Sequence, residues 1–330
     1  MKLLTNRMAV VLLFVVCAVE PVMAQGEQFK AVSEWLDRMA HSGREQSYQG
    51  TFVYIAGMDM ETLSITHLVK DGEVRERVVA LSGPVKETRP AAARGVSDTP
   101  SGEAALLSDS VFPQISPQAL RRARRAYFFR LDGDDRVAGL SAQKISIIPR
   151  DRFRFGYELW LERETGLILR WELLDTNRRP LAKLMFTELR IGDALDLQRL
   201  EQELRDEKLV SRSLEATVSA RDSLASEQGI RFRGLPPSFS LTGQAHANAL
   251  DQTGAEHLVF SDGLVSVSVY LEPVTESQGR RQGLSRMGTT SAWSRQQGDV
   301  QVTTVGEVPP ATLKRIGQSM LNEAAQRQRR

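Results

Sequence analysis

The sequence is poor in the residues that most often carry chemistry. Its 330 residues include one cysteine and four histidines. Cys17 lies in an apolar N-terminal run, so the remainder of the chain offers no thiol for a disulfide or a thiolate nucleophile. No two histidines have metal-ligand spacing, and no G-x-S-x-G, P-loop or G-x-G-x-x-G motif occurs. These absences predict a protein that is not an enzyme and that uses no metal or cofactor.

The chain also lacks a large excess of either charge. Its formal net charge is +2, with 41% hydrophobic and 25% charged residues, which is ordinary for a globular protein. A balance this close to neutral provides no protein-wide field for nucleic acid, so we expect no nucleic-acid partner. At roughly 100–200 residues per domain, the length predicts two domains.

The N-terminal segment has the pattern of an export signal. Lys2 and Arg7 are followed by an apolar run at 8–19, which is shorter than the roughly 20 residues that span a bilayer. Val22-Met23-Ala24 then supplies the small residues of a cleavage site. We therefore predict a signal peptide at 1–24 and export to the periplasm. An uncleaved anchor is the alternative, and lipidation of Cys17 is not expected because the branched Val16 precedes it.

After residue 24 the pattern predicts an α+β domain over 25–192. Apolar residues spaced as one helical face occupy 29–39, and the period then changes to two. Expected strands are 48–55, 63–69, 74–81, 127–131, 136–148, 157–161, 167–174 and 184–191. Turns are expected at Asp71-Gly72 and at Asp132-Gly133-Asp134-Asp135, and a long loop at 90–117. A sheet of this many strands must curl, close or be covered to protect its edges.

A charged stretch at 193–229 separates this part from a second predicted domain at 230–330. Its leucines keep no heptad, which favours a partly helical connector over a coiled coil. The second domain is predicted to be α+β, with a strand in two parts over 258–271 that pairs with 300–305. A terminal helix is expected after Pro309-Pro310, with a buried stripe of Leu313, Ile316, Met320 and Ala324.

One strand of the first domain is a candidate wall for a lipid cavity. Alternation places Leu167, Leu169, Trp171 and Leu173 on one face and Arg170 on the other. The same pattern describes a filled hydrophobic core, which is the default for such residues.

Two arginine-rich segments are candidates for binding a partner or a lipid headgroup. The first contains Arg121, Arg122, Arg124 and Arg125, and the second alternates Arg150, Arg152 and Arg154 with Phe153, Phe155 and Tyr157. Such segments suit phosphate groups, acidic segments or amphiphiles. A solvated surface and structural arginines are the alternatives. Tyr270, on the polar side of the 265–271 strand, is a further candidate.

Long strings in both predicted domains resemble the RseB/MucB family. They include YQGTFVY at 48–54, DRVAGLSAQKISIIPRDRFRFGYELWLERETGL at 135–167 and VTTVGEVPPATLKRIGQSM at 302–320. DGEVRERVVALSGP at 71–84, LAKLMFT at 181–187 and FSDGLVSVSVYLEP at 260–273 occur in the same order. One departure is that the family's Pro-x-Gly-Phe is similar to Pro236-Pro237-Ser238-Phe239 here.

The resemblance implies a fold and a function. The expected N-terminal domain senses lipid and is a LolA/LolB-like curled antiparallel sheet, a half-open barrel with covering helices and an apolar cavity. It is followed by a smaller C-terminal α+β domain that is expected to bind the partner. The expected partner is the periplasmic domain of a RseA/MucA-type anti-sigma factor, which the protein shields from site-1 proteolysis. Lipopolysaccharide or lipoprotein acyl chains would release it. A lipoprotein carrier of LolA type is the alternative function, and homo-oligomerisation is left open.

Overall fold

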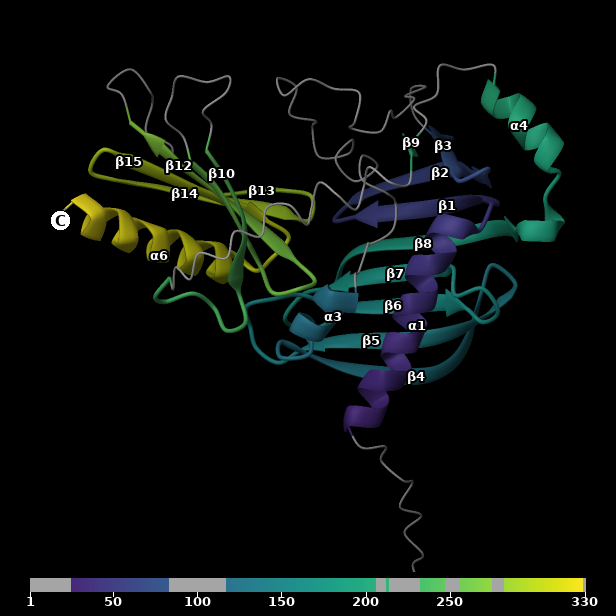
Figure 1. The fold of residues 1–330 in the computed structure, drawn as a ribbon, viewed down its shortest axis with the longest axis horizontal. Helices are drawn as coiled ribbons and strands as arrows, with labels where there is room; N and C mark the ends of the chain where they lie inside the picture. Colours follow the sequence, from purple (N-terminus) through teal and green to yellow (C-terminus); the bar gives the residue numbers. More distant parts are fainter. Residues whose placement is uncertain are drawn as a thin grey trace, which may run out of the picture.

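The fold comprises two antiparallel sheets, each covered on one face by a long helix (Figure 1). The computed structural model describes residues 25–82, 117–205, 212–213, 232–246, 256–274 and 282–328. The predicted loop at 90–117 and the predicted boundary near 215–230 lie largely outside these ranges. Among the described residues, no helix is both long and apolar enough to cross a membrane.

The first sheet has nine strands in the order β4-β5-β6-β7-β8-β1-β2-β3-β9. Its end strands β4 and β9 are not paired with each other, so the sheet is curled and open rather than a closed barrel. The strands are β1 (Tyr48–Ala56), β2 (Asp59–Lys70), β3 (Glu73–Ala80), β4 (Tyr127–Val137), β5 (Leu140–Pro149), β6 (Gly156–Glu162), β7 (Ile168–Leu174), β8 (Pro180–Ile191) and β9 (Arg212–Ser213).

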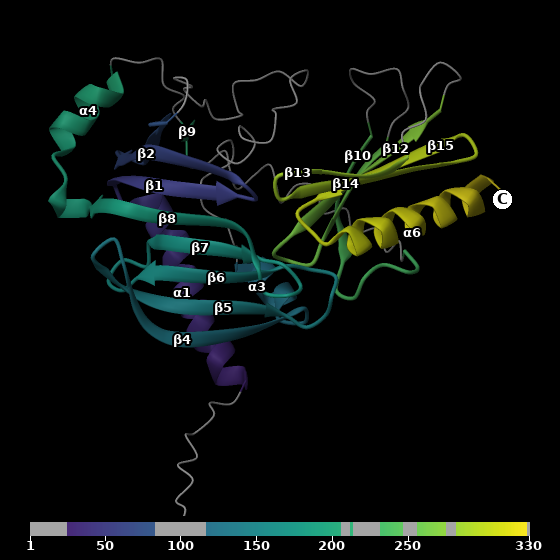
Figure 2. The ribbon, with the colours of Figure 1, turned by 180° about the vertical axis from the view of Figure 1, so that it is seen from behind.

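The helices of this part are α1 (Gln25–Glu45), α3 (Pro117–Ala123), the short 3₁₀ helix η2 (Gly192–Ala194) and α4 (Leu197–Arg205). Helix α1 crosses one face of the sheet, and its stripe of Val32, Leu36 and Met39 is at most 4% exposed (Figures 1 and 2). That stripe is the one predicted from the spacing of apolar residues. Part of the predicted connector, at β9, adds to the edge of the sheet by pairing with β3.

The second sheet has six strands in the order β10-β11-β12-β15-β14-β13 and is covered by helix α6 (Pro310–Gln328). The strands are β10 (Ser240–His246), β11 (Glu256–Ser261), β12 (Ser266–Pro273), β13 (Gly283–Met287), β14 (Thr290–Gln297) and β15 (Val300–Gly306). The pairing of β12 with β15 confirms the predicted contact. We refer to the elements α1 to β9 as the first domain and to β10 to α6 as the second domain.

The predicted turn at Asp132–Asp135 is wrong. Strand β4 continues through these residues with a bulge between Leu131 and Gly133, and the chain reverses instead at Ala138-Gly139, both at positive φ. Gly133, at φ 96°, accommodates the bulge without a side chain. The aspartates are satisfied across the sheet: Asp132 accepts from Ser146, and Asp135 accepts from Nε1 of Trp160 at 2.7 Å. Among the described residues, no carboxylate cluster suited to a metal ion is present.

Candidate functional site

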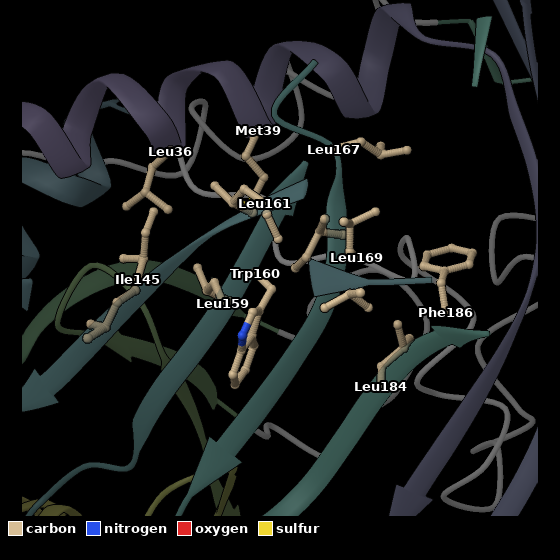
Figure 3. Close-up of a cluster of buried hydrophobic side chains, with 14 of the residues drawn as sticks. Leu36, Met39, Ile145, Leu159, Trp160, Leu161, Leu167, Leu169, Leu184 and Phe186 are labelled. Atoms are coloured by element: carbon tan, nitrogen blue, oxygen red, sulfur yellow. The ribbon is translucent and has the colours of Figure 1, made fainter. Parts of the chain in front are cut away.

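The residues predicted to line a cavity are packed side chains in this structure. Leu167 and Leu169 lie under α1 with Leu36 and Met39 (Figure 3), and the two β-strand-side leucines, Leu167 and Leu169, are at most 1% exposed. The predicted cavity wall is therefore filled core at these positions, the alternative that the sequence left open.

Farther along β7, the same face continues with Trp171 and Leu173. Leu173 is 1% exposed and packs with Phe155 and Ala182, while Trp171 is partly buried beside Tyr54, with ring centroids 6.2 Å apart. The Tyr54 hydroxyl and the Trp171 Nε1 are buried and form no hydrogen bond with the described residues. A buried polar atom without a partner is costly, so this end of the face is the part best suited to accept an external hydrogen-bonding group.

The opposite face of the sheet is not the simple solvated surface that alternation predicts. Glu172 is 5% exposed and forms ion pairs with Arg170 and Lys183 from β7 and β8. Arg170 also lies over the Trp160 ring at 4.1 Å. Burial alone raises the pKa of the Glu172 carboxyl, but hydrogen bonds from Arg170 and Lys183 outweigh it and hold the pKa below its ordinary value. This face is stabilised by a cross-strand ionic network.

The two arginine-rich segments meet at the start of β4. The N–H of Arg150 donates to the carbonyl of Ala126 at 2.9 Å, and its Nε donates to the carbonyl of Tyr127 at 3.1 Å. These bonds place the β5–β6 loop beside the end of α3. We define the arginine edge by its exposed residues, which are Arg121, Arg122, Arg124, Arg125, Arg150 and Arg152. Within the described residues, none of them forms an ion pair with a carboxylate.

Aromatic rings lie beneath part of the arginine edge. Arg124 lies 4.8 Å from the Phe29 ring centroid, and Arg150 lies 3.6 Å from that of Phe128, which is 39% exposed. A cavity of about 20 Å³ opens between these side chains, large enough for a water molecule but not for an acyl chain. The arrangement suits a phosphate or carboxylate bound at the surface, with an apolar neighbour alongside.

Arg154 does not belong to this surface, which corrects the prediction that it contacts an external partner. Its side chain is fully buried between the two domains. Nε donates to Asp151 at 3.1 Å, Nη2 donates to the carbonyl of Pro237 at 2.6 Å, and Nη1 lies 3.2 Å from Oδ2 of Asp262. The alternative of a structural arginine bonded to neighbouring turns holds at this position.

Asp262 also forms several hydrogen bonds at the domain interface. It is fully buried, accepts a hydrogen bond from the Tyr127 hydroxyl at 3.1 Å, and accepts from the N–H groups of Leu264 and Val265 at 3.0 and 3.1 Å. Burial raises the pKa of the Asp262 carboxyl, although these donors and Arg154 act in the opposite direction. We call Arg154, Asp262, Tyr127, Asp151 and the Pro237 carbonyl the interdomain latch.

Other contacts extend the domain interface around the latch. Thr312, on the first turn of α6, donates to the carbonyl of Phe153 at 2.6 Å, and Arg315 lies 4.9 Å from the Phe153 ring. Tyr157 packs against the cores of both domains. Of the residues predicted for binding, Phe153 and Tyr157 are therefore interface residues. The sequence contained no signal that would have paired Asp262 with Arg154, which lies in the other domain.

Tyr270 lies on the face of the second sheet that α6 does not cover. It is 37% exposed and stacks on His257 of the neighbouring strand, with ring centroids 4.5 Å apart. Burial lowers the pKa of His257, so the ring is neutral at pH 7. Tyr270 belongs to the second sheet and the arginine edge to the first domain, so the predicted binding residues do not form a single site.

Comparison with known proteins covers both domains. Residues 31–204 match the model of the MucB/RseB N-terminal domain, and residues 225–321 match that of the MucB/RseB C-terminal domain. The sigma factor AlgU regulatory protein MucB of Pseudomonas aeruginosa is 33% identical over 303 residues, which cover 89% of this chain and 92% of that protein. The sigma-E factor regulatory protein RseB of Escherichia coli is 23% identical over 297 residues, with coverage of 88% and 91%.

Solved structures agree with these sequence matches. A complex of Pseudomonas aeruginosa MucA and MucB aligns with a TM-score of 0.63 at 31% identity, covering 87% of this chain and 97% of that one. MucB in complex with MucA(peri) aligns with a TM-score of 0.61 at 32% identity, with coverage of 86% and 96%. The family models, the sequence relatives and these folds all span both domains in the same order. The chain belongs to the MucB/RseB family.

Proposed function

We propose that this protein is a periplasmic negative regulator that binds the periplasmic domain of a membrane-spanning anti-sigma factor. By covering that domain it would protect it from the first proteolytic cut and so restrain the envelope-stress sigma factor. The observation that carries the proposal is the likeness, over 87% of the chain, to MucB solved in a complex with MucA. The absence of a nucleophile–base arrangement in the sequence is consistent with a protein that acts by binding.

The partner is tested with purified components. The chain from Gln25 onward is titrated into the periplasmic domain of the anti-sigma factor from the same organism, and the heat of binding is measured. We expect a complex at micromolar concentration or tighter and slower cleavage by the site-1 protease. If no complex forms at micromolar concentration, the proposal fails.

Export is part of the same proposal. The predicted signal peptide at 1–24 precedes α1, which begins at Gln25. Mass spectrometry of protein recovered from the periplasm should give a chain that begins at Gln25. A chain that retains Lys2 and Arg7 would instead indicate an anchor.

We further propose that an amphiphile with an anionic headgroup releases the partner. The arginine edge supplies cations that form no ion pair within the described residues, and it lies beside the exposed Phe128. The buried hydroxyl of Tyr54 and Nε1 of Trp171 form no hydrogen bond with the described residues. A ligand shifts the complex only by its difference in affinity for the free and bound forms. Adding lipopolysaccharide to the preformed complex should release the anti-sigma domain, and an Arg124→Ala/Arg150→Ala variant should require more of it. An unchanged affinity in the presence of lipopolysaccharide would count against this step.

A further inference from the structure

The part of the chain that follows the predicted signal peptide carries sulfur only in methionine. The sequence contains one cysteine and nine methionines, and Cys17 and three of the methionines lie within residues 1–24. The structure describes all six of the others, which are Met39, Met58, Met60, Met185, Met287 and Met320. An oxidant that attacks sulfur in this part of the chain therefore attacks a thioether and forms methionine sulfoxide.

The six methionines differ sharply in exposure. Met39 and Met320 are core residues of the two domains and are 4% and 1% exposed. The other four are exposed to solvent, namely Met58 at 100%, Met60 at 68%, Met287 at 55% and Met185 at 39%. Because a dissolved oxidant must reach the sulfur atom, these four are the reactive thioethers and the two core methionines are protected.

Three of the exposed methionines lie around strand β1 of the first domain. Met58 lies in the turn between β1 and β2, and Met60 on β2 is opposite Ile55 of β1. Met185 on β8 is opposite Val53 on the other side of β1. We call Met58, Met60 and Met185 the methionine patch. The fourth exposed methionine, on β13, belongs to the second domain.

Strand alternation places the patch on the face of the first sheet that α1 does not cover, the face toward the viewer in Figure 2. Phe52 of β1 and Leu184 of β8 belong to the core, so their neighbours Val53 and Met185 point to the opposite face. An exposed apolar side chain by itself is ordinary, but methionine is one that a single chemical step makes polar. The sulfurs of the patch support no core packing, so that step leaves the fold intact.

We propose that the methionine patch is a site of reversible oxidation by peroxides. A sulfur lone pair attacks one oxygen of hydrogen peroxide, so that a sulfur–oxygen bond forms while the oxygen–oxygen bond breaks. The departing hydroxide takes the proton from the transferred oxygen and leaves as water. The sulfur loses two electrons and the peroxide gains them, which replaces three apolar groups on one face of the first domain by polar sulfoxides.

Peptide mass spectrometry tests the site. The chain from Gln25 onward is treated with a limiting amount of hydrogen peroxide, and each methionine is followed by the gain in mass of one oxygen atom. Met58, Met60 and Met185 should be oxidised at least about 10-fold faster than Met39 and Met320, because susceptibility follows exposure. Equal rates for patch and core methionines would overturn the proposal.

A triple variant tests whether the patch changes the surface. Leucine is apolar and close to methionine in volume, so Met58→Leu/Met60→Leu/Met185→Leu keeps the face apolar but removes its oxidisable sulfur. Oxidised wild type should be retained less by a hydrophobic-interaction column than untreated wild type, and the triple variant should lose most of this shift. The matched control is Met287→Leu, which removes the remaining exposed sulfur and should keep most of the shift. A triple variant that shifts as much as the wild type would contradict the proposal.

Reversal and folding are measured on the same samples. Methionine sulfoxide reductases of both types, one for each sulfoxide epimer, should restore the retention of the oxidised wild type. Circular dichroism should be the same before and after oxidation, whereas a loss of signal would show that a core methionine had reacted and would overturn the proposal. Oxidation of the patch requires no partner, so this experiment and the binding experiment with the anti-sigma domain can fail independently.

Discussion

At the scale of single residues, Ser238 adopts a conformation that its side chain disfavours. Its φ is 66°, in the left-handed region, and it lies between Pro237, whose carbonyl accepts from Arg154, and Phe239, whose ring lies 5.2 Å from the guanidinium. The departure from Pro-x-Gly-Phe noted in the sequence thus falls at the domain interface. A serine here costs roughly 1 kcal/mol relative to an unstrained residue.

We therefore expect Ser238→Gly to stabilise the protein by about 0.5–1 kcal/mol, because glycine adopts this φ without a Cβ clash. Urea denaturation monitored by tryptophan fluorescence measures the change. Ser240→Gly is the control, because Ser240 begins strand β10 and glycine should weaken it. A loss of stability in both variants would contradict the assignment of strain to Ser238.

Glu172 predicts a pH dependence of stability. Its folded-state pKa is lowered, so it contributes stability above its unfolded pKa of about 4.3, and this contribution is lost as pH falls. Glu172→Gln should cost about 1.5–3 kcal/mol at pH 7, the contribution of a hydrogen bond to a charged group. Urea denaturation measures the free energy of unfolding of both proteins. The difference between the variant and the wild type should decrease as pH falls toward 4. Glu188→Gln, at an exposed position, should show no gap at any pH.

At the scale of elements, hydrophobic pattern predicted most strands of the first domain but not their ends. Period-two alternation located β1, β2, β3, β6, β7 and β8, because each has one face packed against the core. The pattern failed at β4, where the Asp132–Asp135 run is held in a strand by cross-strand partners. Strand β13 was not predicted, since all its residues are exposed and no buried face marks it.

The candidate sites were predictable only as segments. Arginine runs pointed to the arginine edge, but the difference between exposed Arg152 and buried Arg154 depends on Asp262 and Pro237, which are distant in sequence. The hydrophobic pattern of a segment indicates which of its side chains lie on the same face of a helix or strand. These sites depend instead on which elements, distant in sequence, pack against each other.

The contact between α3 and the β11–β12 turn is an element-scale prediction. A Cβ at Gly263, whose φ is 109°, would lie 2.3 Å from the carbonyl oxygen of Ala119 and 2.9 Å from the N of Ala123. Gly263→Ala should therefore force α3 and the second domain apart and lower the melting temperature measured by calorimetry. Gly133→Ala is the matched control, because Gly133 has a similar φ of 96° but nothing within 4 Å of its Cβ position. The control should lose only the stability that backbone strain costs. If the contact with α3 is important, Gly263→Ala should therefore have a lower melting temperature than Gly133→Ala.

At the scale of the whole molecule, the interdomain latch fixes the arrangement of the two domains. Arg154 lies in the first domain and Asp262 in the second, and their ion pair joins the two domains. Both side chains are fully buried, and removal of Arg154 leaves the Asp262 carboxyl without its ion-pair partner, whereas Arg154 has a second carboxylate partner in Asp151. Loss of the latch should therefore alter stability and domain arrangement together.

We expect Arg154→Ala to cost about 3–5 kcal/mol, the range for breaking a buried ion pair, and to separate the domains. The double variant Arg154→Met/Asp262→Asn should recover most of the stability, because the introduced amide retains an acceptor oxygen for the N–H groups of Leu264 and Val265. Since the only cysteine is Cys17, cysteines introduced at the exposed Met58 and Asn322 can carry a pair of dyes, and energy transfer between them reports the domain arrangement.

Energy transfer should fall in Arg154→Ala under conditions where circular dichroism is unchanged, and the double variant should restore it. Affinity for the anti-sigma domain should fall with it, because a partner that contacts both domains must then overcome the cost of bringing them together. If energy transfer falls while affinity does not, the partner binds one domain alone.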